Sequence, residues 1–163
     1  MNQYNKITRF FAIVLVAGGI AGIVIFGIIG IRAIKQSWVP ILLIGVLIAL
    51  FLWSVFTGFR LWQGTPYGRK WAIILFASQI PILSRPGFEY RWYTGANFNL
   101  ILRSVNNSVN IDWGAAIGSG CGFSIGAGVD TIEIGVNLFA VIALILLMHA
   151  NNSFKLKPLL GTS

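Results

Sequence analysis

Two runs of about 20 residues without a single charge constrain this chain more than any other feature. Phe10–Ile31 is the first run and Trp38–Phe59 is the second. Runs of this length and composition are typical of helices that cross a lipid bilayer. Only 10% of the residues are charged, against about 25% in soluble domains, so the chain lacks the polar side chains to cover a water-facing surface. The sequence predicts an integral membrane protein.

Two shorter apolar segments extend this pattern. Trp71–Leu83 and Ile132–Ala150 are interpreted as a third and a fourth span. The third is only about 20 Å long as a helix against a bilayer core of about 30 Å, so it needs to start near Tyr67, with Arg69 and Lys70 reaching toward the interface. The predicted fold class is α-helical membrane protein, with four transmembrane helices and a small β-rich extracytoplasmic insertion. Its antiparallel strands lie between helices three and four.

This fold divides the chain into four parts. Residues 1–83 form helices one to three with short basic loops, and residues 84–131 form the β-rich module. Residues 132–150 form the fourth helix, and residues 151–163 form a cytoplasmic tail.

The distribution of charge predicts the orientation in the membrane. All four acidic residues lie between positions 84 and 135, namely Glu89, Asp112, Asp130 and Glu133. Basic residues flank the apolar runs, and those expected to contact lipid and to set orientation are Arg60, Arg69, Lys70, Lys155 and Lys157. Because cytoplasmic loops carry the excess of Lys and Arg, both termini are expected in the cytoplasm. The location expected is a bacterial inner membrane with residues 84–131 in the periplasm.

The net charge of +8 raises the question of a nucleic-acid partner. A nucleic-acid groove needs a clustered basic face, whereas these basic residues occur in ones and twos at the ends of apolar runs. We therefore expect the charges to contact the bilayer, including its anionic lipids, and we expect no nucleic acid as a partner.

Small residues recur along the first apolar run. Gly18, Gly22 and Gly27 are the positions expected to pack against another helix, since Gly18 and Gly22 form a small-xxx-small step. The other helix belongs to this chain, to a second copy or to another membrane protein. The competing explanation is that glycine is simply more frequent in membrane helices.

The segment around residue 106 carries the signature of a β-hairpin. Apolar residues alternate up to Val105 and again from Val109, and two asparagines separate the two runs. Asparagine tolerates positive φ, so an Asn-Asn pair can form a two-residue turn. With this turn, Leu102 pairs with Ile111 and Leu100 with Trp113, and one face of the hairpin is apolar. The hairpin and its packing face comprise Leu100, Leu102, Asn106, Asn107, Ile111 and Trp113.

A glycine pattern continues beyond the hairpin. From Trp113 to Val129 every even position is glycine or another small residue, which predicts a strand with one bare face onto which Tyr90 or Trp92 packs. The glycine face comprises Gly118, Gly120, Gly122, Gly126 and Gly128. The alternative is a membrane-embedded helix or re-entrant element, because Gly114, Gly118, Gly122 and Gly126 also fall at i, i+4 spacing. We favour strands because each interior glycine costs a helix about 1 kcal/mol.

The sequence offers no recognisable chemistry. Cys121 and His149 are single, and the four carboxylates lack the spacing of a calcium loop. We expect no catalytic residue, no cofactor and no metal site, and therefore no enzyme. The expected function is that of an accessory, assembly or scaffold subunit that presents a β module outside the membrane. The alternative is a component of a transporter or channel with a glycine-rich re-entrant element.

Overall fold

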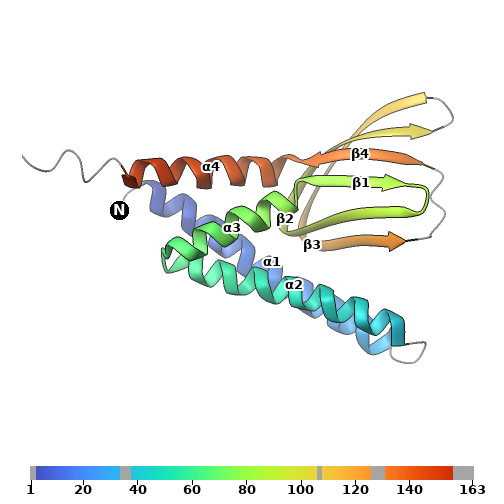
Figure 1. Cartoon of the computed structure of the whole chain (residues 1–163), viewed down its shortest axis with the longest axis horizontal. Helices are drawn as coiled ribbons and strands as arrows, with labels where there is room; N and C mark the ends of the chain where they lie inside the picture. Colours follow the sequence, from blue (N-terminus) through green and yellow to red (C-terminus); the bar gives the residue numbers. More distant parts are fainter. Residues whose placement is uncertain (1–2, 34–37, 106–107, 126–130, 156–163) are drawn as a thin grey trace, which may run out of the picture.

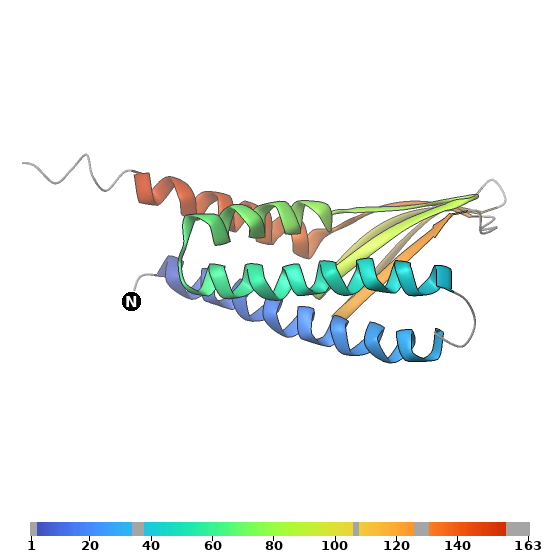
Figure 2. The same cartoon turned by 60° about the horizontal axis from the view of Figure 1, so that its bottom comes forward.

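The computed structural model describes residues 3–33, 38–105, 108–125 and 131–155, and these form four helices and a four-stranded sheet. Helices α1 and α2 run side by side along the length of the molecule, with α3 and α4 beside one half and the sheet beside the other (Figures 1 and 2). The elements in chain order are α1 Gln3–Ala33, α2 Trp38–Trp62, α3 Pro66–Ser78, β1 Pro81–Arg85, β2 Phe88–Val105, β3 Ser108–Ile125, β4 Ile132–Asn137 and α4 Leu138–Lys155.

The prediction of four transmembrane helices is wrong. Among the described residues, two helical segments are long and apolar enough to cross a membrane, Lys6–Ile31 of α1 and Leu42–Trp62 of α2. Helix α3 has 13 residues, or about 20 Å. The apolar part of α4 is Leu138–His149, which is also too short to cross a core of about 30 Å.

The two shorter segments fail as spans because each changes from helix to strand. Helix α3 ends at Ser78, just before Gln79 and the helix-breaking Pro81. At the other segment, β-branched residues alternate from Ile132 to Val136, which favours a strand. Helix α4 begins only after Asn137, whose Oδ1 accepts a hydrogen bond from the Ala140 backbone N at 3.3 Å, as a helix N-cap does.

The two changes from helix to strand lie next to each other. The backbone N of Asn137 donates to the Ile80 carbonyl at 2.9 Å. Two aromatic side chains of β2 close the end of α3, since the Tyr90 hydroxyl and the Trp92 indole N–H both donate to the Ser78 carbonyl, at 2.7 and 3.0 Å. These bonds supply a partner for a carbonyl that a helix end leaves unsatisfied. Helix α3 therefore leads into β1, and β4 leads into α4. The two strands are neighbours in the sheet (Figure 1).

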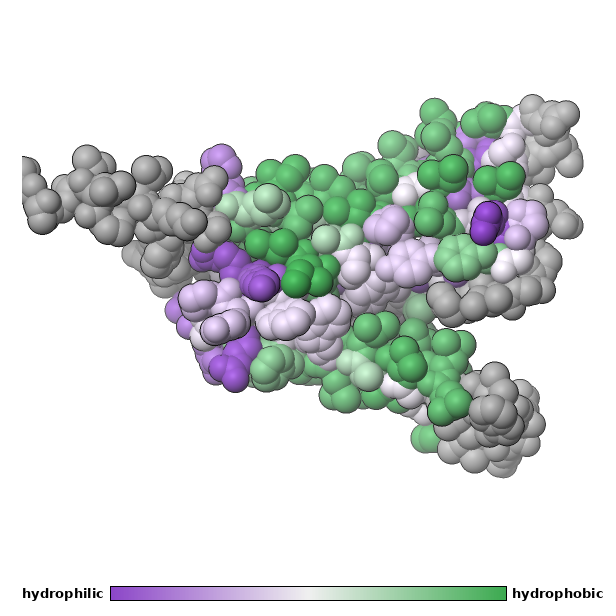
Figure 3. Space-filling view, viewed as in Figure 1, coloured by the Kyte–Doolittle hydropathy of each residue, from purple (hydrophilic) through white to green (hydrophobic). Residues whose placement is uncertain are grey.

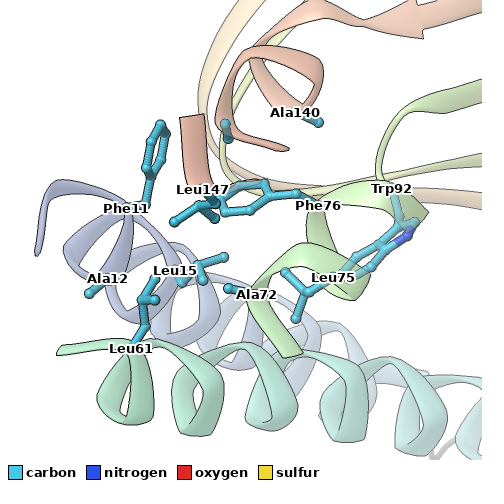
Figure 4. Close-up of a cluster of buried hydrophobic side chains, with 11 residues drawn as sticks. Phe11, Ala12, Leu15, Leu61, Ala72, Leu75, Phe76, Trp92, Ala140 and Leu147 are labelled. Atoms are coloured by element: carbon cyan, nitrogen blue, oxygen red, sulfur yellow. The ribbon is translucent and has the colours of Figure 1, made fainter. Parts of the chain in front are cut away.

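The helical half of the molecule has an apolar core. It is formed by buried side chains of all four helices together with Trp92 of β2 (Figure 4). Phe11 contacts Phe76 and Phe139 edge to face, with ring centroids 5.6 and 6.1 Å apart. The core residues are Phe11, Ala12, Leu15, Leu61, Ala72, Leu75, Phe76, Trp92, Ala140, Ala143 and Leu147.

The sheet curls back on itself. Strand β3 pairs with β2 along its whole length, from Phe88↔Ile125 to Val105↔Ser108. The other edge of β2 pairs with β1 near its start and with β4 near its end, and β1 and β4 also pair with each other. Strand β2 has to bend between these two pairings, so the β2–β3 ribbon has two arms. The first arm contains Phe88–Thr94 of β2 and the second contains residues 96–105.

Candidate interaction surface on the sheet

Two glycines form the bend of the β2–β3 ribbon. Gly95 of β2 and Gly118 of β3 are paired in the ladder. Both have positive φ, +90° and +130°. Residues other than glycine rarely adopt this backbone conformation. The bend therefore depends on a cross-strand pair of glycines, one in each strand.

Helix α1 packs directly on this bend. A Cβ added at Gly18 would overlap the backbone N of Gly95, and a Cβ added at Gly95 would overlap Val14. Beside this contact, the Ser119 hydroxyl donates to the Gly18 carbonyl at 2.5 Å. The backbones of α1 and β2 thus touch where neither has a side chain, and the sheet is held against the middle of α1.

Buried polar side chains also hold β2 in place next to the bend. The Ser54 hydroxyl of α2 donates to the Leu15 carbonyl at 2.9 Å and lies 3.2 Å from the Thr94 hydroxyl. The Gln79 side-chain oxygen accepts from the Thr94 backbone N at 3.2 Å. Ser54, Thr94 and Gln79 are all fully or almost fully buried. Because buried polar groups are costly without partners, these bonds fix one arrangement of α1, α2 and β2.

The inner face of the sheet is polar and carries a network of ion pairs. Glu133 of β4 is contacted by Arg91 at 2.9 Å and by Arg103 at 2.7 Å. Arg103 also contacts Asp112 of β3 at 3.1 Å. Arg91 and Arg103 come from the two arms of β2, so Glu133 joins the arms. Two arginines and two carboxylates leave the network without net charge. Asn97 and Asn99 are also buried on the inner face.

The outer face of the sheet is apolar and exposed, which reverses the arrangement of a sheet that packs an apolar core. Trp113 is 75% exposed and Ile117 is 96% exposed. Hydrophobic residues spread over the sheet and α4 in the space-filling view (Figure 3). We define the sheet outer face as Phe98, Leu100, Leu102, Val109, Ile111, Trp113, Ile117, Ile132, Ile134 and Val136, all of them exposed.

Strand β3 adds an open edge to this surface. The strand order is β1-β4-β2-β3, and β1 also pairs with β2. Among the described residues, no strand pairs with the outer edge of β3. Within the part of the chain that the structure describes, this edge of β3 is therefore not part of a ladder. The sequence from Val109 to Ile117 contains no Lys or Pro, the residues that often protect an edge strand from pairing.

The hairpin has the register that its alternation predicts. Leu102 pairs with Ile111 and Leu100 with Trp113. Val105 pairs with Ser108, so the connection falls on Asn106 and Asn107, which lie outside the described residues. The side chains of both pairs lie on the sheet outer face.

The glycine-rich segment is a strand as far as Ile125. Its glycines lie on the inner face, where Tyr93 covers Gly120 and Glu89 covers Gly122. Tyr90 and Trp92 point to the opposite side, so the expectation that they cover the glycines is wrong. The predicted Gly126 and Gly128 lie outside the described residues.

The three packing glycines of α1 differ. Gly18 meets the sheet rather than a helix, whereas a Cβ at Gly22 would overlap the Phe51 ring of α2. Gly27 has nothing within 4 Å of an added Cβ. Gly19 and Gly58, which the sequence did not single out, let α1 and α2 approach closely, since added Cβ atoms would lie 2.6 Å from Val55 and 2.7 Å from Val16.

The predicted lipid-facing basic residues gather at one end of the molecule. Arg60 lies in the last turn of α2 and covers the Phe56 ring at 5.1 Å. Arg69 and Lys70 lie near the start of α3, and hydrophilic residues mark this end in Figure 3. Lys155 is the last residue of α4, and Lys157 lies outside the described residues.

Cys121 lies beside a small cavity between α2 and the first arm of the ribbon. The cavity has a volume of about 190 Å³, and Trp92 and Leu47 also line it. Burial, with a smaller contribution from the Glu89 carboxylate, raises the pKa of the Cys121 thiol. Among the described residues, no group of three or more His, Cys, Asp or Glu side chains could hold a metal ion.

Sequence reasoning missed the residues that hold the sheet in place. Ser54 and Thr94 are ordinary polar residues in apolar surroundings, and Gln79 follows directly after the apolar helix α3. A buried polar side chain within an apolar run was the available signal. The arginines that meet Glu133 could not be identified, because their pairing depends on the curl of the sheet.

Comparisons of the chain with family models, with curated proteins and with solved structures give no match.

Proposed function

We propose that this protein is a small, non-enzymatic membrane protein that acts as an accessory, assembly or scaffold subunit. The sheet outer face and the open edge of β3 are the surface that binds its partner, another membrane protein or a second copy. The observation that carries the proposal is the exposure of Ile117 and Trp113 beside a strand edge that no other strand of the described residues pairs with.

The position of the sheet along α1 supports a location within the membrane. The apolar segment Lys6–Ile31 has 26 residues and is about 39 Å long, and Gly18 lies near its middle. Because Gly18 contacts Gly95 at the bend, the sheet starts at the level of the bilayer centre if α1 crosses the membrane. Its arms then extend toward the side opposite the basic end, which is the periplasmic side of a bacterial inner membrane under the positive-inside rule.

The two faces of the sheet fit this location. An apolar outer face around a polar inner face is also the arrangement of membrane β-barrels, and a large exposed apolar patch marks a contact with lipid or protein. Lipid covers apolar side chains but cannot bond to backbone groups, so open strand edges do not face the hydrocarbon of a bilayer. We therefore expect a strand of another protein molecule to pair with the edge of β3.

The polar inner face also bears on the alternative function in transport. Arg91, Glu133, Arg103 and Asp112 neutralise one another across the sheet. This pairing supports a structural role for the charges, because each carboxylate already has an arginine partner. We therefore place the scaffold function ahead of transport.

Site-specific photo-crosslinking tests the proposal. A photoreactive amino acid replaces Ile111 on the sheet outer face, and a matched chain carries it at Gln63, which is exposed in the loop after α2. After irradiation in intact membranes, we expect a discrete protein adduct from position 111 and none from position 63. If position 111 gives only unmodified monomer while the protein is present in the membrane fraction, the scaffold function is wrong.

A further inference from the structure

A groove between α1 and α4 has the composition of a site for one lipid chain. Its volume is about 420 Å³, and apart from one lysine its lining is entirely apolar. The lining residues are Lys6, Ile7, Phe10, Phe11, Phe139, Ile142 and Leu146.

The groove has a fixed floor and open rims. Phe11 is buried in the helical core and contacts Phe139 edge to face, so these rings cannot move aside without disturbing the core. Phe10 and Ile142 are both more than half exposed at the rims. Helix α4 turns its small buried residues, Ala140 and Ala143, toward the core. The larger residues Phe139, Ile142 and Leu146 line the groove instead.

Charge decides what kind of molecule fits the groove. Lys6 lines one end, and this end of the molecule also carries Arg9, Arg60 and Lys70 on α1, α2 and α3. The acidic residues that the structure describes, Glu89, Asp112 and Glu133, are all in the sheet. A ligand that is apolar along its length and carries a negative charge at one end complements this groove.

We propose that the groove binds an anionic phospholipid. One acyl chain lies over Phe11 and Phe139, and the phosphate of the headgroup lies at Lys6. A second groove between α1 and α2, of about 330 Å³, fits this ligand less well. Its lining residues carry no charge, and Arg9 stacks on the ring of one of them, Trp62, at 5.3 Å. The proposal rests on the membrane location in the proposed function and adds a specific ligand.

Native mass spectrometry of the full chain in mild detergent tests the site. The probes are phosphatidylglycerol and phosphatidylcholine with identical acyl chains. We expect the wild type to retain more phosphatidylglycerol. Lys6→Gln should lower this preference about fivefold, the effect of about 1 kcal/mol for one basic side chain at a lipid surface. Lys70→Gln removes the same charge at the same end of the molecule but outside the groove, so it should lower the preference clearly less than Lys6→Gln does.

A second pair of variants tests the acyl-chain position. Ile142→Trp should fill the groove and lower retention of both lipids, whereas Ile145→Trp, on an exposed position of α4 that does not line the groove, should not. Equal effects of Lys6→Gln and Lys70→Gln, equal effects of the two tryptophan variants, or a lipid-free dimer would each overturn the proposal. Because each variant is first recovered from the membrane fraction, such a result leaves the membrane location standing and removes only the lipid site.

Discussion

Gly18 of α1 and Gly95 of β2 meet backbone to backbone, with no side chain between them. This contact joins the middle of the longest apolar helix to the bend of the sheet. It sets the level of the sheet relative to α1 and thereby the depth at which the sheet outer face meets its surroundings.

The contact predicts a sharp difference between two glycines of the same helix. Gly18→Ala should lower the free energy of unfolding by about 2–3 kcal/mol, because the new methyl group meets backbone that cannot turn aside. Gly27→Ala has open space around it and should raise stability by up to about 1 kcal/mol through helix propensity. Thermal unfolding in detergent, followed by circular dichroism, measures both. Equal melting temperatures for the two variants would show that α1 does not pack on the sheet at Gly18.

The bend predicts a cost that comes from the backbone alone. Gly118 has positive φ but open space for a Cβ, so Gly118→Ala should destabilise the protein by about 1–2 kcal/mol. Gly114→Ala also has open space but lacks positive φ, and it serves as the control with little expected change. A Gly118→Ala protein as stable as Gly114→Ala would mean that the ribbon does not bend at this pair.

The inner-face network predicts unequal roles for two carboxylates. Glu133→Gln leaves Arg91 and Arg103 without their shared partner and should cost about 1–2 kcal/mol, below the value for a fully buried pair because both arginines are partly exposed. Asp112→Asn breaks a pair whose side chains are both more than 40% exposed, so about 0.5 kcal/mol is expected. Chemical unfolding of the two variants under the same conditions tests the order, and a reversed order contradicts the role of Glu133.

We expect the maleimide labelling of Cys121 to depend on pH differently in the folded and the unfolded protein. Its ordinary pKa is 9.0, and burial raises the pKa in the folded protein, so the folded thiol stays protonated at pH values where the unfolded thiol ionises. The thiolate is the reactive form. Maleimide labelling of the folded protein should therefore still increase with pH where labelling of the unfolded chain has levelled off.

The same shift sets the sign of its effect on stability. The contribution of Cys121 is fully present below pH 9 and is lost as pH rises through the folded pKa, because the folded state holds the proton more tightly. Cys121→Ser should remove this part of the pH dependence. Identical labelling profiles for the folded and the unfolded chain would contradict the burial of the thiol.

The sequence predicted local structure better than it predicted the length of the helices. The charge-free runs located α1 and α2, and the alternation around Asn106 gave the pairing of Leu102 with Ile111. The prediction of transmembrane helices failed at Trp71–Leu83 and at Ile132–Ala150, because each of these apolar segments contains both a helix and a strand. Hydropathy reports burial in an apolar environment and does not separate these two conformations in a short segment.

The curl of the sheet could not be predicted at all. It depends on β1 and β4 pairing with different parts of one edge of β2, which are contacts between residues far apart in the chain. The glycine pattern indicated a bare face, but it could not show that Gly118 pairs with Gly95 at a bend. The ion pairs of Glu133 depend on that bend, so they could not be predicted either.

Labelling of two single cysteines from outside the cell tests the central claim most directly. In a Cys121→Ser background, Ser108→Cys lies near the start of β3 and Ile117→Cys lies beside the bend, and both positions are exposed in the isolated chain. With a membrane-impermeant maleimide, we expect position 108 to label readily and position 117 to stay protected until the membrane is dissolved. Ile117 is 96% exposed in the chain itself, so its protection has to come from lipid or from a bound partner. Equal and rapid labelling of both positions in intact cells would place the sheet in water and contradict the proposed function.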